Sequence, residues 1–166
     1  KDEALKEYAQ NIQSAGQSLL SIINDILDIS KIESGKLEIL PTKYQLFSIL
    51  NDCYNLTKAK LEEKSVRLEL EINEKLPSGL YGDEVRIRQI INNFLSNAAK
   101  YTQEGVITFS MDFQEKSQDE IWLMISVTDT GIGIKEEDLS KLFESFTRIE
   151  EKRNRNIEGT GLGLNL

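Results

Sequence analysis

The sequence predicts an α+β fold, in which one long N-terminal helix is followed by a two-layer sandwich of helices and strands. Three observations predict it. Apolar residues recur at alternating spacings of three and four over the first thirty residues, which is typical of a helix that packs against other helices. After that, segments with helical periodicity follow short segments typical of strands, and turn residues separate one segment from the next. Finally, 166 residues with 39% hydrophobic content suffice for one packed core beside an appended element.

The N-terminal segment is expected to be one helix of about 30 residues, roughly 45 Å long. Its apolar residues follow heptad spacing, and polar residues fill the positions between them. Ser34 and Gly35 supply a flexible end. So narrow a stripe favours a helical bundle or coiled coil, with packing on the chain's own sheet as the alternative. The seam consists of Leu5, Tyr8, Ile12, Ala15, Leu19, Ile22, Ile26 and Ile29.

Between this helix and residue 101, strands and helices alternate along the chain. Lys36 to Leu40 is interpreted as a short strand that Pro41 stops, because proline has no N–H to donate to a sheet. Asp83 is a suitable N-cap residue for the last helix of this region. In chain order, the other elements expected are a helix over 46–64, a strand over 66–72, a turn at 77–79 and a helix over 83–101.

The remainder of the chain begins with a hairpin and becomes increasingly polar. Strands are expected over 106–113 and 121–127, and a short helix over 136–143. Residues 147–158 are charged and lack apolar periodicity, which predicts a mobile loop. A glycine-rich run follows, Gly159-Thr160-Gly161-Leu162-Gly163-Leu164.

Composition excludes several classes of function. A formal net charge of −8 without a basic block does not suit a nucleic-acid surface, so we expect no nucleic-acid partner. The single cysteine, Cys53, excludes an internal disulfide and a cysteine-cluster zinc site. The absence of histidine excludes Ser-His-Asp catalysis, and a divalent metal would need oxygen ligands, which favours Mg²⁺. No apolar run reaches the ~18 residues that span a bilayer.

The helix expected over 83–101 carries the first candidates for chemistry. At 100° per residue, Asn93, Asn97 and Lys100 fall within about 60° of one another. Amide oxygens ligate hard cations and a lysine neutralises phosphate, although such residues on a helix are more often simply solvated. The opposite side is expected to pack inward, with Ile87, Ile91, Phe94, Leu95 and Ala98.

Two glycine motifs complete the candidates. The first, Asp129-Thr130-Gly131-Ile132-Gly133, follows an apolar strand, and its glycines permit close approach of the main chain to a ligand. Its aspartate can accept a hydrogen bond from an exocyclic amine such as that of adenine. In the second, over 159–164, small residues let successive N–H groups point at an anion. Neither is a Rossmann or Walker A motif, because Glu136 replaces the third glycine and no Gly-Lys-Ser/Thr occurs.

In this order and spacing, the motifs resemble the conserved boxes of the sensor histidine kinases of two-component systems. Residues 18–39 are similar to the second helix of the dimerisation and phosphoacceptor domain and its exit. The resemblance covers essentially the whole chain and implies a Bergerat-type ATP-binding fold. The matching boxes are the N box from Asn93 to Thr102, the G1 box from Asp129 to Gly133, the F box from Phe143 to Phe146 and the G2 box from Gly159 to Leu164.

The resemblance implies a role for each matching residue. Asn97 would ligate Mg²⁺, with Asn93 supporting the metal and the phosphates, and Lys100 would contact phosphate oxygens. Asp129 would hydrogen-bond the adenine amine. Residues 147–158 would be the ATP lid. The implied cofactors are ATP and Mg²⁺, and the implied site comprises Asn93, Asn97, Lys100, Tyr101, Asp129, Gly131, Gly133, Arg148, Gly159, Thr160, Gly161, Leu162, Gly163 and Leu164.

The same nucleotide fold also serves ATPases such as gyrase, the MutL repair proteins and a heat-shock chaperone. These resemble the N box but place a glutamate four residues before the metal-binding asparagine to activate water. Here that position is Asn93, and a carboxamide is not a general base. We therefore expect a histidine kinase, with a degenerate nucleotide-binding scaffold or an ATPase of this fold as the alternatives.

The resemblance also implies an organisation. Residues 1–35 are expected to be the second helix of the phosphoacceptor hairpin, and residues 36–166 the ATP-binding domain without its last helix and strand. Without a histidine, the chain is expected not to phosphorylate itself. The partners implied are a phosphoacceptor histidine domain, a response regulator receiver domain and a second copy of the intact protein, in a cytoplasmic phosphorelay.

Overall fold

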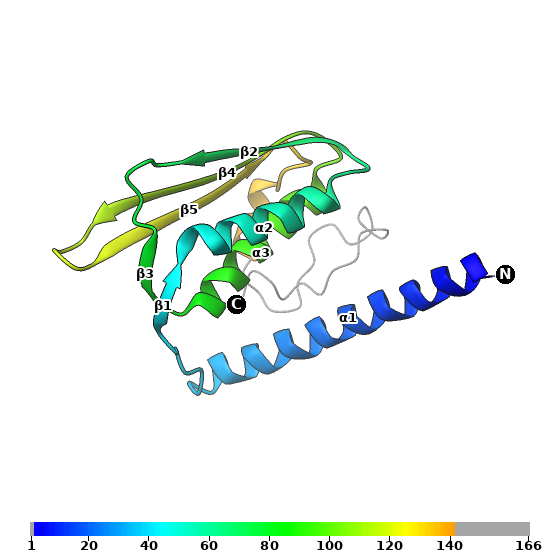
Figure 1. The fold of residues 1–166 in the computed structure, drawn as a ribbon, viewed down its shortest axis with the longest axis horizontal. Coiled ribbons are helices and arrows are strands. Elements are labelled where there is room, and N and C mark those ends of the chain that lie inside the picture. Colours follow the sequence, from blue (N-terminus) through cyan, green and yellow to red (C-terminus); the bar gives the residue numbers. More distant parts are fainter. Residues whose placement is uncertain (1, 142–166) are drawn as a thin grey trace. The chain divides into compact units, whose positions relative to one another are not determined.

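A computed structural model describes residues 2–141 of the chain. Helix α1 (Asp2–Glu33) belongs to one compact unit, and residues 39–139 form another (Figure 1). The elements of the second unit are β1 (Thr42–Gln45), α2 (Leu46–Lys60), β2 (Ser65–Ile72), β3 (Gly79–Gly82), α3 (Glu84–Tyr101), β4 (Glu104–Glu115) and β5 (Ile121–Asp129). A short 3₁₀ helix, η1, follows over Glu136–Lys141.

Helix α1 confirms the long helix that the heptad spacing predicts. It ends at Glu33, and Gly35 adopts a left-handed φ of 65°. The N–H of Lys36 donates to the carbonyl of Lys31 at 2.8 Å, which satisfies an unpaired carbonyl of the last turn. The apolar seam remains largely open to solvent. Its member Ile29 is buried, whereas five of its large members are exposed, as are three apolar residues beside it. The exposed members are Leu5, Tyr8, Ile12, Leu19 and Ile26, and the exposed neighbours are Leu20, Ile23 and Leu27.

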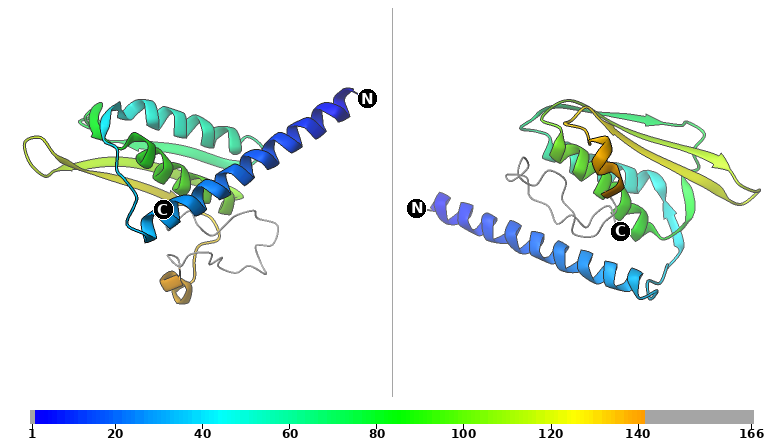
Figure 2. Two further views of the ribbon diagram at one scale, coloured as in Figure 1. Left: turned by 90° about the horizontal axis from the view of Figure 1, so that it is seen from below. Right: turned by 180° about the vertical axis from the view of Figure 1, so that it is seen from behind.

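The main sheet has the strand order β2-β4-β5. Strand β2 runs parallel to β4, with Leu68 opposite Ile107, and β4 runs antiparallel to β5, with Phe109 opposite Val127. Helices α2 and α3 cover one face of this sheet, as both figures of the fold show (Figures 1 and 2). This is the two-layer α/β sandwich that the sequence predicts. Strands β1 and β3 form a separate antiparallel pair.

The core lies between the helices and the sheet. Its largest fully buried side chains come from α2, α3 and β4, and alternate residues of β2 and β5 pack against them. Cys53 of α2 is buried among them, and burial raises the pKa of its thiol, so the residue is a packing group. The fully buried members include Leu46, Ile49, Ile91, Leu95, Ile107, Phe109 and Met111.

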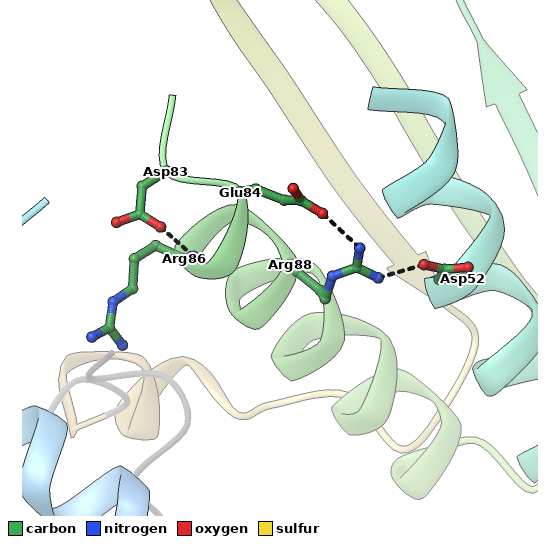
Figure 3. Close-up of polar contacts among 5 residues, drawn as sticks. All are labelled: Asp52, Asp83, Glu84, Arg86 and Arg88. Carbon is green, nitrogen blue, oxygen red and sulfur yellow. Dashed lines mark hydrogen bonds and ion pairs between the residues drawn. The ribbon is translucent and has the colours of Figure 1, made fainter. Parts of the chain in front are cut away.

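One ion pair joins α2 to the first half of α3, and a second lies within α3 (Figure 3). Arg88 reaches Asp52 at 2.7 Å and Glu84 at 2.9 Å. Asp83 caps α3, as predicted, because its Oδ1 accepts the N–H of Arg86 at 3.1 Å. None of the helices within residues 2–141 has the length and hydropathy that a membrane crossing requires.

The structure corrects several predicted boundaries. No strand forms over Lys36–Leu40, and β1 instead begins after Pro41, where it pairs with β3, a strand that was not predicted. Helix α2 ends at Lys60 and not at residue 64. The N–H of Leu61 donates to the carbonyl of Lys58, only three residues back, which is the hydrogen bond of a 3₁₀ turn. The short helix predicted over 136–143 is 3₁₀ over its described part.

Candidate functional site

Helix α3 presents the predicted polar stripe. Asn93, Asn97 and Lys100 are half-buried, whereas Ile91 and Leu95 on the opposite side are buried in the core. Phe94 is a correction to the predicted inward face, since 44% of the residue is exposed. At 100° per residue it lies on the flank between the two faces.

Two members of the stripe differ in their surroundings. The Nζ of Lys100 lies 5.0 Å from the ring centroid of Tyr101, a cation–π distance. The carboxamide of Asn97, by contrast, accepts and donates no hydrogen bond within the described part of the chain. A half-buried polar group without a protein partner is suited to receive a ligand.

Strand β5 ends at Asp129, and the carboxylate of this residue is held by the loop that follows it. The N–H of Gly131 donates to its Oδ1 at 2.8 Å, and the hydroxyl of Thr102 lies 3.4 Å from the same oxygen. Its other oxygen, Oδ2, takes no hydrogen bond from residues 2–141. The geometry therefore orients the carboxylate and leaves one oxygen for an external donor.

The end of α3 and the loop after β5 are in direct contact. The N–H of Ile132 donates to the carbonyl of Tyr101 at 3.4 Å. A Cβ at Gly131 would lie 2.5 Å from the carbonyl oxygen of Tyr101 and 3.0 Å from the Oγ1 of Thr102, so no larger residue fits. Gly133 adopts a φ of 67°, which also favours glycine.

Of the predicted site residues, the structure therefore brings Tyr101, Asp129 and Gly131 into one junction. Asn93, Asn97 and Lys100 share the half-buried face of the helix that leads to it. The remaining predicted parts of the site lie outside the described residues. They are the F box, Arg148 with the segment 147–158, and the glycine-rich run Gly159, Thr160, Gly161, Leu162, Gly163 and Leu164.

Two residues of this junction carried no predicted role. Thr102 is fully buried and its hydroxyl lies beside Asp129, although the sequence shows only a threonine at the end of the N-box motif. Lys64 donates to the carbonyl oxygens of Ala99 and Thr102. These carbonyls are 35 and 38 residues away, so no local pattern could have indicated the contact.

A shallow hollow of about 390 Å³ lies elsewhere, at the end of β2 and the middle of β4. Its polar residues are paired with each other, with Asn73 donating to Asp112 at 2.6 Å and Ser110 donating to Glu71 at 3.3 Å. None of the predicted site residues lines it. The junction between α3 and β5 remains the better candidate.

Comparison with known proteins agrees with the motifs. Residues 1–35 match the His Kinase A (phospho-acceptor) domain. The chain is 38% identical over 165 residues to Hybrid signal transduction histidine kinase B of Dictyostelium discoideum, covering 99% of the chain and 8% of that protein. It is 36% identical over 159 residues to Signal transduction histidine-protein kinase BarA of Escherichia coli, covering 96% of the chain and 17% of that protein. The chain thus spans less than a fifth of these curated relatives.

A solved structure gives the same fold. Full-length ShkA in complex with AMPPNP aligns with a TM-score of 0.75 at 26% identity, covering 96% of this chain and 32% of that one. Residues 82–166, which include α3, β4 and β5, match the family described as histidine kinase-, DNA gyrase B- and HSP90-like ATPase. That match covers more than half of the chain. The chain therefore belongs to the histidine kinase-, DNA gyrase B- and HSP90-like ATPase family.

Proposed function

We propose that this chain is the ATP-binding catalytic module of a sensor histidine kinase, which transfers the γ-phosphoryl group of Mg-ATP to a histidine. The observation that carries the proposal is the junction at Asp129. One oxygen of its carboxylate is fixed by Gly131 and the other is open, beside a helix whose polar face holds Asn97. Membership of the family over residues 82–166 supports the same assignment.

The proposed roles follow the chemistry of each group. Asp129 accepts a hydrogen bond from the exocyclic amine of adenine, and Gly131 and Gly133 form the floor beneath the base. Lys100 neutralises phosphate oxygens, and Tyr101 lines the nucleotide. Arg148 and the N–H groups of residues 159–164 are proposed to contact the phosphates from the resemblance alone.

The residues present fit a magnesium ion that is shared with the nucleotide. Within residues 2–141, no group of three or more histidine, cysteine, aspartate or glutamate side chains is placed to hold a metal by itself. Mg²⁺ commonly takes one or two protein oxygens and completes its shell with phosphates and water. The amide oxygens of Asn97 and Asn93 on one helix face are such a partial set. When bound, the ion would neutralise charge on the transferring phosphoryl group.

Phosphoryl transfer requires positioning and charge stabilisation more than covalent chemistry by the protein. An imidazole nitrogen attacks the γ-phosphorus, the bond to the β–γ bridging oxygen breaks, ADP leaves and the imidazole proton passes to solvent. The 166 residues contain no histidine, so the acceptor must belong to a phosphoacceptor domain outside these residues. The chain by itself should therefore not become phosphorylated.

Asn93 favours transfer over hydrolysis. Its carboxamide cannot take a proton from water, whereas the ATPases of this fold carry a glutamate at the corresponding position. Hydrolysis should consequently be slow, and ATP should remain available for transfer. An ATPase of this family and a scaffold that binds nucleotide without transfer remain the competing functions.

We propose residues 1–35 as a helix of the phosphoacceptor hairpin and 36–166 as the catalytic domain. The exposed seam of α1 is suited to a second helix, which supports a homodimer in the intact protein. Use of ATP and of a response regulator receiver domain as the next phosphoryl acceptor would place the module on the cytoplasmic side.

Radiolabelled Mg-ATP distinguishes these functions. With a separate phosphoacceptor domain added in trans, the kinase assignment predicts acid-labile, alkali-stable phosphate on that domain and none on this chain. Steady-state phosphate release without transfer would identify an ATPase. Nucleotide binding with neither product would identify a scaffold.

A further inference from the structure

Lys64 lies in the turn between α2 and β2, and its ammonium group reaches the C-terminal end of α3. Its Nζ donates to the carbonyl oxygen of Ala99 at 2.5 Å and to that of Thr102 at 3.2 Å. The residue is half-buried, and both Ala99 and Thr102 are buried. The contact therefore lies inside the domain, where a lost donor is not replaced freely by water.

The position has a clear electrostatic reason. The last carbonyls of a helix lack intrahelical partners and carry the negative end of the helix dipole, so a cation there is stabilising. Lys64 forms no ion pair with a carboxylate among residues 2–141. Its charge is thus matched by the end of α3 and by no acidic side chain of the described chain.

The two carbonyls lie on either side of the helix end. Ala99 belongs to the last turn of α3, whereas Thr102 is already extended, with φ −105° and ψ 120°. One ammonium group that holds both fixes the direction in which the chain leaves the helix. That direction determines where the carbonyl of Tyr101 and the hydroxyl of Thr102 lie.

The end of β5 and the loop that follows it pack against these same atoms. The hydroxyl of Thr102 lies 3.4 Å from the Oδ1 of Asp129, and Gly131 approaches the carbonyl of Tyr101 too closely to carry a Cβ. From this chain of contacts we infer that Lys64 is a positioning residue for the adenine end of the nucleotide site. It acts through Thr102 and Asp129 and does not touch the nucleotide. This inference rests on the proposed function.

The test uses the full 166-residue chain and compares Lys64→Met with Lys64→Arg. Methionine keeps the length of the side chain without its charge or donors, and arginine can donate to both carbonyls. Lys60→Met is the matched control, because Lys60 is an exposed cation in the last turn of α2. Dissociation constants for Mg-ATP and Mg-GTP are measured by calorimetry well below the unfolding midpoint of each variant.

Because Asp129 is proposed to select adenine, misplacing it should reduce selectivity and not only affinity. For Lys64→Met we expect the Kd for ATP to rise about tenfold and that for GTP about twofold, as expected when one charge-assisted contact is disturbed. Lys64→Arg should restore the ATP preference to within about twofold of the wild type, and Lys60→Met should not change it.

An unchanged ATP-to-GTP preference in Lys64→Met, with a lowered unfolding midpoint, would mean that Lys64 only stabilises the helix end, and would overturn the inference. If Lys64→Met does not fold, Lys64→Gln, which keeps a donor but loses the charge and some reach, is judged by the same criterion. If the wild-type chain binds no ATP, the proposed function itself fails. If it binds ATP without preference over GTP, the role of Asp129 fails and this inference with it.

Discussion

The two ends of α3 are both tied to the rest of the domain, but by different kinds of contact. At the first end, Asp83 accepts the N–H groups of Arg86 and Leu40, and Arg88 pairs with Asp52 and Glu84 in partly exposed ion pairs (Figure 3). At the last end, Lys64 donates to the buried main-chain carbonyls of Ala99 and Thr102. The hydroxyl of Thr102 lies beside the carboxylate of Asp129, and Gly131 lies too close to the carbonyl of Tyr101 to carry a Cβ.

Because of this difference, we expect the two ends of α3 to tolerate substitutions to different extents. Partly exposed ion pairs can be replaced by water, so each contributes little free energy. Buried carbonyls and a closely approached glycine have no such replacement. We therefore expect changes at the first end to affect stability modestly and nucleotide binding hardly at all, and changes at the last end to affect both.

Gly131→Ala should have the largest effect. Its Cβ would lie 2.5 Å from the carbonyl oxygen of Tyr101 and 2.8 Å from the Oδ1 of Asp129, so main chain must move. We expect the free energy of unfolding to fall by about 2–3 kcal/mol, as for overpacked sites. The Kd for Mg-ATP should rise more than about tenfold. Urea unfolding and calorimetry measure the two effects.

Gly79→Ala is the matched control for that substitution. A Cβ at Gly79 would meet only the Nε2 of Gln45, at an ordinary contact distance of 3.8 Å. Its effects on stability and on Mg-ATP binding should both be small. Equal losses in Gly79→Ala and Gly131→Ala would contradict the close packing proposed for the junction.

Arg88→Met tests the first end of the helix. The substitution removes the pairs with Asp52 and Glu84 but keeps most of the apolar stem. Since the arginine side chain is 32% exposed and its partners more so, we expect a loss of about 0.5–1 kcal/mol, reduced further by salt. The Kd for Mg-ATP should stay within about twofold of the wild type. A tenfold loss of affinity would contradict the division of the helix.

Asp83 should make a small, acid-sensitive contribution. Hydrogen bonds from the N–H groups of Leu40 and then Arg86 hold the pKa of Asp83 below its ordinary value of 3.8. The native state therefore binds fewer protons than the unfolded state in this range, so stability is present above the ordinary pKa and is lost as the pH falls toward the native pKa.

Asp83→Asn isolates that contribution, because asparagine caps a helix about as well but does not titrate. The hydrogen bond from Asn73 also lowers the pKa of Asp112. Since Asp112 is present in both the wild type and Asp83→Asn, its effect on stability cancels when the two are compared. Unfolding midpoints from pH 6 down to about pH 3 should therefore fall more steeply for the wild type than for Asp83→Asn. Parallel curves would show that the carboxylate has no such linkage.

Much of this fold follows from local pattern. The heptad seam predicts α1, alternation predicts β2, and two apolar segments separated by a polar turn predict the β4–β5 hairpin, because each pattern is set by neighbours in sequence. The error at Lys36–Leu40 arose because alternating residues there have no strand to pair with. The strand that does form, β1, depends on Gly79–Gly82, a short segment with two glycines and no strand signal of its own.

The candidate site divides in the same way. The motif order indicated Asn97, Asp129 and Gly131 because their residue types and spacing carry the chemistry. Lys64 could not be predicted, since its partners are set by how the turn after α2 meets α3 in three dimensions. Phe94 was expected to be inside because it is apolar, but its angular position decides its exposure.

The most direct test of the account is calorimetric titration of Mg-ATP into the wild type, Asp129→Asn and Asn97→Ala. Both variants should keep their unfolding midpoints, because asparagine at position 129 retains an oxygen that can accept the N–H of Gly131, and the carboxamide of Asn97 has no partner in the described chain. Each should bind Mg-ATP at least about tenfold more weakly, and Asn97→Ala should lose the dependence on Mg²⁺. Wild-type affinity with intact Mg²⁺ dependence in both variants would contradict the claim that these residues form a nucleotide site.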